Sequence, residues 1–348
     1  MTDTVLVSAE AARRAATGVL VARDVPQAAA EIVARNLVAA DERGIDTHGL
    51  FCLPEYANAV ADRRINPDPE ITIVKRMPWA LSVDGANGLG PLVAETAVEA
   101  LLETCEGLGI AVATVKNSNH FGATGVYIAR AAEQGMIAFA SANAIAMTAP
   151  TGAKARFFGT NPLATVVPAG KYPPFALDMA TSDGALRKVR KALADGKSIP
   201  VGWANDKDGN PTTDPAAAID GMLLPFGGAK GSGLAFFLDI LTGALSGGLF
   251  SIDVRNNFTN QDRASGNGHF FFAIKISAFL DEGDFAARME AEIDRLHALP
   301  TVAGVDRVRY PGERMAGIAA ERAATGIPYA KRIIESVVAL GGGEALGL

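Results

Sequence analysis

Hydrophobic positions in the first part of the chain recur every three to four residues, which is the spacing of an amphipathic helix. Residues 8–44 show this pattern with one interruption near Pro26, a residue type that suits the first turn of a helix. Residues 50–64 repeat the spacing despite Pro54 near their start. The pattern therefore predicts two helices followed by a third.

Short apolar runs bounded by glycine, proline and polar residues follow, and such runs predict strands. They lie at residues 71–75, 79–83, 110–115, 136–142, 163–167, 175–178 and 269–276. Helical spacing predicts helices over residues 91–106, 123–135, 182–195, 231–246, 284–299, 315–325 and 329–340. This mixture of strands and helices predicts an α/β or mixed α+β fold.

The longest apolar stretch, residues 233–250, contains Asp239 and several glycines and serines. We interpret it as a buried helix rather than a membrane span, so no membrane partner is expected. The first ten residues have no basic segment followed by an apolar one, as a secretory signal would. A cytoplasmic protein is expected.

Composition excludes several classes of function. Of 348 residues, 49% are hydrophobic and 20% are charged, which is typical of a folded globular protein rather than a disordered one. The net charge of −6 and the lack of basic clusters give no reason to expect a nucleic-acid partner. Two cysteines, Cys52 and Cys105, are too few for a disulfide framework and favour a reducing compartment.

Four histidines limit the possible chemistry, and their spacing matches no zinc motif, so no metal is expected. His48 lies between two glycines, where a ligand can approach the backbone and where Asp46 or Thr47 can orient the imidazole. Acid/base chemistry and a surface or capping role both remain open for it. His120 ends a predicted strand after polar residues, where ligand-binding loops often lie, although a structural role is equally open.

Three glycine-rich segments suggest binding loops. Residues 227–233 precede a predicted helix and bring backbone N–H groups and Lys230 to one point, which favours an anion site over a flexible turn. Residues 85–90 have their glycines in the wrong order for a dinucleotide fingerprint, so they predict a turn. Residues 206–210 lack the alternation of a calcium loop and predict a surface turn.

Several segments together resemble the malate/L-lactate dehydrogenase family, NAD(P)-dependent 2-oxo acid reductases that are distinct from the Rossmann-fold lactate and malate dehydrogenases. The matching segments are DTHGL (46–50), DGANGLG (84–90), NSNHFGATG (117–125), FGTNPLA (158–164), LDMATS (177–182), PVGWANDKDGNPTTDP (200–215), LLPFGGAKGSGLA (223–235), GHFFFAI (268–274) and PGER (311–314). Sulfolactate, ureidoglycolate and diketogulonate dehydrogenases are similar, as are Δ1-piperideine-2-carboxylate reductases.

The resemblance implies a malate/L-lactate dehydrogenase-like fold with a non-Rossmann cofactor-binding domain, in a homodimer. Its expected parts are an N-terminal helical part (1–70), an NAD(P)-binding α/β domain (71–305) and C-terminal helices packing on the N-terminal part (306–348). The implied activity moves a hydride between NAD or NADP and C2 of a 2-oxo or 2-hydroxy acid. Reduction of a cyclic imine, such as Δ1-piperideine-2-carboxylate or Δ1-pyrroline-2-carboxylate, is the alternative, and a non-catalytic dinucleotide-binding protein is a third.

The resemblance also assigns residues. It makes His48 the proton donor and Thr47 its orienting neighbour. It places the dinucleotide on His120, Phe121, Gly122, Ala123, Thr124, Thr160, Asp178, Met179, Ala180, Ala229 and Lys230, with Gly312, Glu313 and Arg314 as a weaker match.

Two positions depart from the family pattern and concern the substrate pocket. Cys52 stands where the family usually has an arginine that clamps the substrate carboxylate, and a thiol cannot replace a guanidinium. Either another cation, Arg43 or Arg187, takes this role, or the substrate presents a different group. Lys188 stands near the position of an aspartate in the imine-reductase branch, which weakens the imine interpretation.

Overall fold

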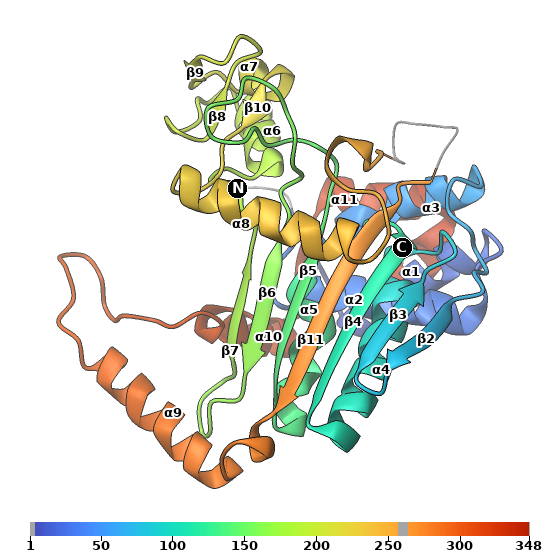
Figure 1. The fold of residues 1–348 in the computed structure, drawn as a ribbon. Coiled ribbons are helices and arrows are strands. Elements are labelled where there is room, and N and C mark those ends of the chain that lie inside the picture. The colour runs from blue at the N-terminus through green and yellow to red at the C-terminus, as the bar shows by residue number, and fades with distance from the viewer. Residues whose placement is uncertain (1–3, 257–263, 348) are drawn as a thin grey trace.

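A seven-stranded sheet lies at the centre of the computed structural model, which describes residues 4–256 and 264–347 (Figure 1). The strands lie in the order β2-β3-β4-β11-β5-β6-β7. They are β2 (Thr72–Met77), β3 (Ala80–Asp84), β4 (Ile110–Ser118), β5 (Met136–Ala142), β6 (Leu163–Val167), β7 (Phe175–Met179) and β11 (Asn267–Lys275). Only β3 and β4 run parallel, and the other neighbours are antiparallel. This mixed sheet confirms the predicted fold class, because a Rossmann sheet is mostly parallel.

Helices cover both faces of the sheet. On one face α4 (Gly90–Leu108) packs on β4 and β11, and α5 (Thr124–Ile128) packs on β5 and β6. On the other face α8 (Ala229–Asp239) continues into a π-helical turn, Ile240–Ala244, that crosses β11 and β4 (Figure 1). The turn approaches β11 so closely that a Cβ at Gly268 would lie 1.8 Å from the Thr242 carbonyl oxygen.

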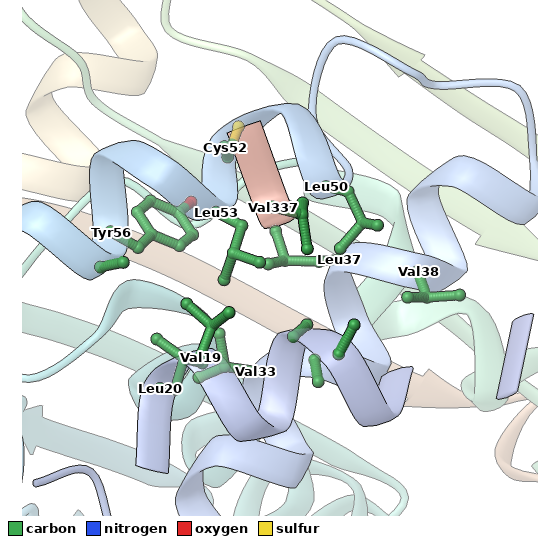
Figure 2. Packing of buried hydrophobic residues seen from close by; sticks show 14 of the residues in the cluster. Val19, Leu20, Val33, Leu37, Val38, Leu50, Cys52, Leu53, Tyr56 and Val337 are labelled. Atoms are coloured by element: carbon green, nitrogen blue, oxygen red, sulfur yellow. The ribbon is translucent and has the colours of Figure 1, made fainter. Parts of the chain in front are cut away.

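The N-terminal residues form the three predicted helices, α1 (Ala9–Val21), α2 (Gln27–Glu42) and α3 (Leu53–Ala61). Ser8 caps α1 by accepting a hydrogen bond from the Ala11 N–H at 3.2 Å. Figure 2 shows how apolar side chains of these helices gather with those of the 3-10 turn Leu50–Cys52 and one from α11 (Lys331–Val337) in a shared core. The labelled members are Val19, Leu20, Val33, Leu37, Val38, Leu50, Cys52, Leu53, Tyr56 and Val337.

The two ends of the described chain are joined by a pairing that the sequence did not reveal. β1 (Thr4–Val7) pairs antiparallel with β12 (Ile327–Ala330), so the predicted helix over 329–340 in fact begins at Lys331. Nearby, α10 (Glu313–Thr325) contacts α2, and α12 (Gly343–Leu346) contacts α1. These contacts support our proposal that residues 1–70, 71–305 and 306–348 form the three parts expected from the family.

A smaller unit lies beyond one end of the sheet, at the top of Figure 1. It contains α6 (Leu186–Ala194), α7 (Pro215–Asp220), β8 (Ala204–Asn205), β9 (Pro211–Thr212) and β10 (Met222–Leu223) around a small core of its own. Its turn at 206–210 is a surface turn as predicted, because the Asp206 carboxylate accepts hydrogen bonds from the N–H groups of Asp208 and Asn210, both at 2.9 Å. A further helix, α9 (Glu282–His297), follows the sheet.

The prediction that residues 233–250 form a buried helix is wrong. Phe236, Phe237, Ile240 and Leu245 are 52%, 54%, 43% and 59% exposed, because only one side of α8 and its π-helical turn packs on the sheet. Hydrophobicity alone does not show which side of a helix lacks a partner. Within the described residues, no helix is both long and apolar enough to cross a membrane.

Candidate active site

A short loop between α2 and the 3-10 turn Leu50–Cys52 carries His48. Asp41, near the end of α2, fixes this loop: its Oδ2 accepts hydrogen bonds from the Leu50 N–H at 2.8 Å and the Tyr329 hydroxyl at 2.9 Å. A Cβ at Gly49 would lie 1.8 Å from Asp41 Oδ1, so the position requires glycine. Burial raises the pKa of Asp41 to about 7. The buried carboxyl group therefore holds the loop in a fixed position.

Thr47 rather than Asp46 orients the His48 ring. Thr47 Oγ1 lies 2.8 Å from His48 Nδ1, which leaves Nε2 as the nitrogen for a substrate. Asp46 instead pairs with Arg322 of α10, whose guanidinium also donates to the Asp41 carbonyl. Of the two neighbours that the sequence offered, the structure therefore selects the hydroxyl.

A second imidazole faces His48. His120, just after β4, lies with its ring centroid 6.0 Å from that of His48, and the planes differ by 19°. The Tyr56 hydroxyl lies 2.8 Å from His120 Nδ1. The pKa of His48 is lowered to about 4, chiefly by burial and then by the charge of Arg187. The pKa of His120 is held well below its usual value by burial, His48 and Arg187. Both rings are therefore neutral at pH 7.

The helical spacing of the sequence marks Tyr56 only as a core position of a helix. Its ring is fully buried, in agreement with that prediction, but its hydroxyl reaches a histidine 64 positions away. The one signal in the sequence is the polar tip of a tyrosine at a core position, since a buried hydroxyl needs a partner.

The loop after β4 is held in place by contacts to both neighbours. Gly122 has φ +80, and a Cβ there would lie 3.2 Å from the His48 carbonyl oxygen. The Gly125 N–H donates to Asp178 Oδ2 at 2.8 Å, and burial raises the pKa of Asp178 to about 6. The predicted loop residues, His120, Phe121, Gly122, Ala123 and Thr124, thus lie between His48 and the end of β7.

The segment 85–90 is the predicted turn, and it supports the loop after β4. The Asn119 side-chain amide donates to the Gly88 carbonyl at 2.8 Å, and the Asn87 N–H donates to the Asn117 carbonyl at 2.8 Å. A Cβ at Gly90 would lie 2.3 Å from the His120 carbonyl oxygen. These glycines therefore serve close packing beneath His120.

Three other predicted cofactor segments meet beyond the end of β7. The Thr160 carbonyl accepts from the Thr181 N–H at 2.8 Å, and the Thr181 carbonyl accepts from the Phe226 N–H at 3.0 Å. These bonds bring Thr160, Met179, Ala180, Ala229 and Lys230 into one region. A hollow of about 550 Å³ adjoins it, lined in part by Gly227, Gly228 and Lys154. Its size and the exposed helix start suit part of a dinucleotide.

Gly312, Glu313 and Arg314 lie at the other end of β7. Gly312 has φ +101, and a Cβ there would lie 2.6 Å from the Pro174 carbonyl oxygen. Glu313 pairs with His297 and Arg307. Because a strand rises about 3.3 Å per residue, this segment lies roughly 13 Å along β7 from the rest of the predicted site. The structure does not bring it to His48.

The two departures from the family pattern have different surroundings. Cys52 is fully buried; its thiol donates to the Thr47 carbonyl at 3.7 Å and accepts from Arg187 Nη2 at 3.4 Å. Burial raises the pKa of the thiol to about 11, so it is neutral. Lys188 instead lies over the Trp203 ring, with Nζ 6.0 Å from its centroid.

Of the two cations considered as replacements, Arg187 lies beside Cys52. Arg43 donates to the Ala39 carbonyl at 3.0 Å, back along its own helix.

Comparisons with known proteins identify the family of the chain. The model of the malate/L-lactate dehydrogenase family matches residues 7–338. A malate dehydrogenase from Pyrococcus horikoshii is 35% identical over 92% of this chain and 90% of its own length. A Δ1-pyrroline-2-carboxylate reductase from Ancylobacter novellus is 33% identical over 92% and 93%.

Solved structures give the same result. Sulfolactate dehydrogenase from Methanocaldococcus jannaschii superposes with a TM-score of 0.90 at 34% identity, covering 99% of this chain and 98% of its own. The resemblance in the sequence is therefore confirmed over almost the whole chain. The chain belongs to the malate/L-lactate dehydrogenase family.

Proposed function

We propose that the protein interconverts 2-oxo and 2-hydroxy acids with a nicotinamide dinucleotide, and that His48 handles the proton. The observation that carries the proposal is the way in which His48 is held. Its Nδ1 is hydrogen-bonded to Thr47, which leaves Nε2 for a substrate, and its loop is held by the buried carboxyl group of Asp41. A rigidly held, half-buried imidazole is well suited to general acid/base catalysis.

The chain's own residues then have separate tasks. When bound, the dinucleotide supplies or accepts the hydride. His48 Nε2–H donates a proton to the oxygen on C2 during reduction, and the neutral ring accepts that proton during oxidation. With Nδ1–H donating to Thr47 Oγ1, the neutral ring has its lone pair on Nε2, as the oxidation requires. Tyr56 positions His120, whose ring lies alongside.

Residues near α8 suit the phosphates of NAD or NADP. The first N–H groups of a helix have no acceptor within it, and their dipole favours an anion. At α8 these groups belong to the exposed segment with Ala229 and Lys230. We propose that this segment, Thr160 and residues 178–180 hold the dinucleotide, with residues 120–124 next to the nicotinamide.

A Lys230→Ala variant is expected to bind the dinucleotide several-fold more weakly. An exposed ion pair contributes up to about 1 kcal/mol, which corresponds to roughly fivefold in Kd. Fluorescence titration with NADH and NADPH measures the two Kd values, and Lys75→Ala, on the exposed strand β2 at the opposite edge of the sheet from β7, is the control. A larger loss for NADPH than for NADH would place Lys230 at the 2′-phosphate. Unchanged Kd values for both would remove Lys230 from the cofactor site.

A substrate screen with both dinucleotides tests the proposed activity. We expect NADH or NADPH consumption with 2-oxo acids such as oxaloacetate, pyruvate and sulfopyruvate. Consumption with Δ1-pyrroline-2-carboxylate alone would favour the imine alternative, which the similarity to the Ancylobacter novellus reductase keeps open. Tight dinucleotide binding with no consumption in either panel would favour a non-catalytic protein.

We also propose a homodimer in which the apolar face of α8 contacts a second copy. Phe236, Phe237 and Ile240 are exposed on this face, and exposed apolar patches of this kind mark interfaces. A Phe237→Glu variant is expected to elute at the mass of a monomer in light-scattering chromatography. Val201→Glu, at an exposed valine in the smaller unit, is the control. An unchanged mass for Phe237→Glu would place the interface elsewhere.

A cytoplasmic location is the last part of the proposal. Cys52 and Cys105 are both buried and unpaired, which is usual in reducing compartments. Cell fractionation tests it, and recovery of the protein in the membrane or secreted fraction would contradict it.

A further inference from the structure

Arg187 of α6 reaches across to the turn that follows His48. Its guanidinium carbon lies 4.3 Å from the centre of the Phe51 ring, and its Nη2 donates to Cys52 Sγ at 3.4 Å. Phe51 and Cys52 are three and four residues after His48. The smaller unit thus delivers a positive charge to the proposed active site.

No carboxylate among the described residues forms an ion pair with this charge. Within residues 4–256 and 264–347, Arg187 forms no ion pair, and its Nη1 is buried without a hydrogen-bond partner. An aromatic ring and a neutral thiol hold the guanidinium in place but do not neutralise it. Arg187 as a whole is half-buried, but a buried N–H donor of a charged group is costly unless it is paired, so this arrangement calls for an anionic ligand.

Nearby carboxyl groups are engaged elsewhere. Asp41 accepts from Leu50 and Tyr329, and Asp46 pairs with Arg322. Glu55 is the remaining candidate: burial raises the pKa of its carboxyl group and the charge of Arg187 lowers it, but Glu55 forms no ion pair with Arg187 among the described residues. The buried Nη1 therefore has no hydrogen-bond partner among the described residues, and a ligand that reaches the guanidinium can supply one.

We propose that Arg187 binds the substrate carboxylate, in place of the arginine that the family usually has at position 52. The inference rests on the proposed role of His48. A guanidinium can grip a carboxylate through two parallel N–H bonds, which fixes C2 relative to the proton donor. Cys52 then has a positioning role, because its thiol links the guanidinium to the Thr47 carbonyl.

The arrangement also couples substrate binding to proton delivery. In the free protein the charge of Arg187 helps to keep His48 neutral. A carboxylate on Arg187 cancels that charge, which makes it easier for His48 to hold the proton that reduction requires.

Arg187→Ala tests the proposal, with Lys191→Ala one helical turn further along α6 as the control. We expect KM for 2-oxo acids to rise roughly 10–150-fold, the value of a charge-assisted hydrogen bond, while the dinucleotide Kd stays unchanged. Millimolar guanidinium chloride should restore part of the loss, whereas sodium chloride at the same ionic strength should not. Arg187→Lys, which keeps the charge without the planar fork, should lie between the two.

Two further readouts report on the carboxylate anchor itself. Oxamate resembles a 2-oxo acid, so its Kd for the protein–NADH complex, measured by calorimetry, reports on carboxylate binding even if no 2-oxo acid is turned over. If only imines react, an imine carboxylate takes the place of oxamate. The pKa in the kcat/KM profile should rise in Arg187→Ala, because a positive charge beside His48 is gone. Unchanged KM and oxamate binding in a folded Arg187→Ala variant would overturn the proposal. An equal loss of oxamate affinity in Glu55→Gln and in Arg187→Ala would also overturn it.

Discussion

A His48→Asn variant is expected to bind NADH and NADPH normally but to turn over about 10²–10⁴-fold more slowly, the usual size of a general-acid contribution. Asparagine keeps a polar side chain of similar size next to Thr47, but it cannot donate or accept a proton during the reaction. The predicted dinucleotide contacts lie on other segments, so cofactor affinity should survive. Steady-state kinetics and fluorescence titration measure the two quantities.

His120→Asn and Tyr56→Phe are the matched comparisons for this variant. The ring of His120 lies alongside that of His48, and its pKa is lowered as well, so it is the imidazole that competes most directly with His48. If His48 handles the proton, each comparison variant should lose much less turnover than His48→Asn. Nearly full turnover in His48→Asn, together with a large loss in His120→Asn and Tyr56→Phe, would transfer the role to His120.

An Asp41→Ala variant is expected to be strongly destabilised and to lose activity as well. Removal of the carboxyl group leaves the Leu50 N–H and the Tyr329 hydroxyl buried without their partner. Each unpaired donor costs about 1–3 kcal/mol, so the free energy of unfolding should fall by roughly 2–6 kcal/mol. The same bond to Leu50 fixes the loop that carries His48, so kcat should fall with stability. Urea unfolding and kcat measured on the folded variant test both effects.

Asp41→Asn is the conservative control. Burial raises the pKa of Asp41 to about 7, so near neutral pH a large fraction of this carboxyl group is already uncharged, and an amide oxygen can accept the same hydrogen bonds. Asp41→Asn should therefore cost much less than Asp41→Ala, and Asp208→Ala at an exposed turn should cost least. Equal unfolding free energies for the parent and Asp41→Ala would contradict the role assigned to this residue.

Local patterns in the sequence predict much of this fold. Helical spacing locates α1, α2 and α3, and short apolar runs locate all seven strands of the central sheet. The β1–β12 pairing escapes prediction because each strand has only four residues and its partner lies more than 300 positions away. The exposure of Phe236 and Phe237 is not predicted either, because a sequence does not show which helix face lacks a partner.

Some residues of the candidate site are likewise indicated by the sequence, and others are not. The glycines around His48 point to it directly, and Thr47 is one of two orienting residues that the sequence offers. Arg187 and Arg43 cannot be separated by sequence, because the choice depends on how α6 packs against the turn after His48. Asp41 gives no signal at all, since its partners Leu50 and Tyr329 are recognised only once the chain has folded.

The pH dependence of kcat/KM, measured in both directions for the parent and for His48→Asn, tests the central claim most directly. Reduction needs protonated His48, whose pKa is about 4, so its kcat/KM should fall about tenfold per pH unit above that value. Oxidation needs the neutral ring, so its kcat/KM should rise through the same pKa and then level off. The account predicts that His48→Asn loses both dependences. The same two profiles in His48→Asn as in the parent would contradict it.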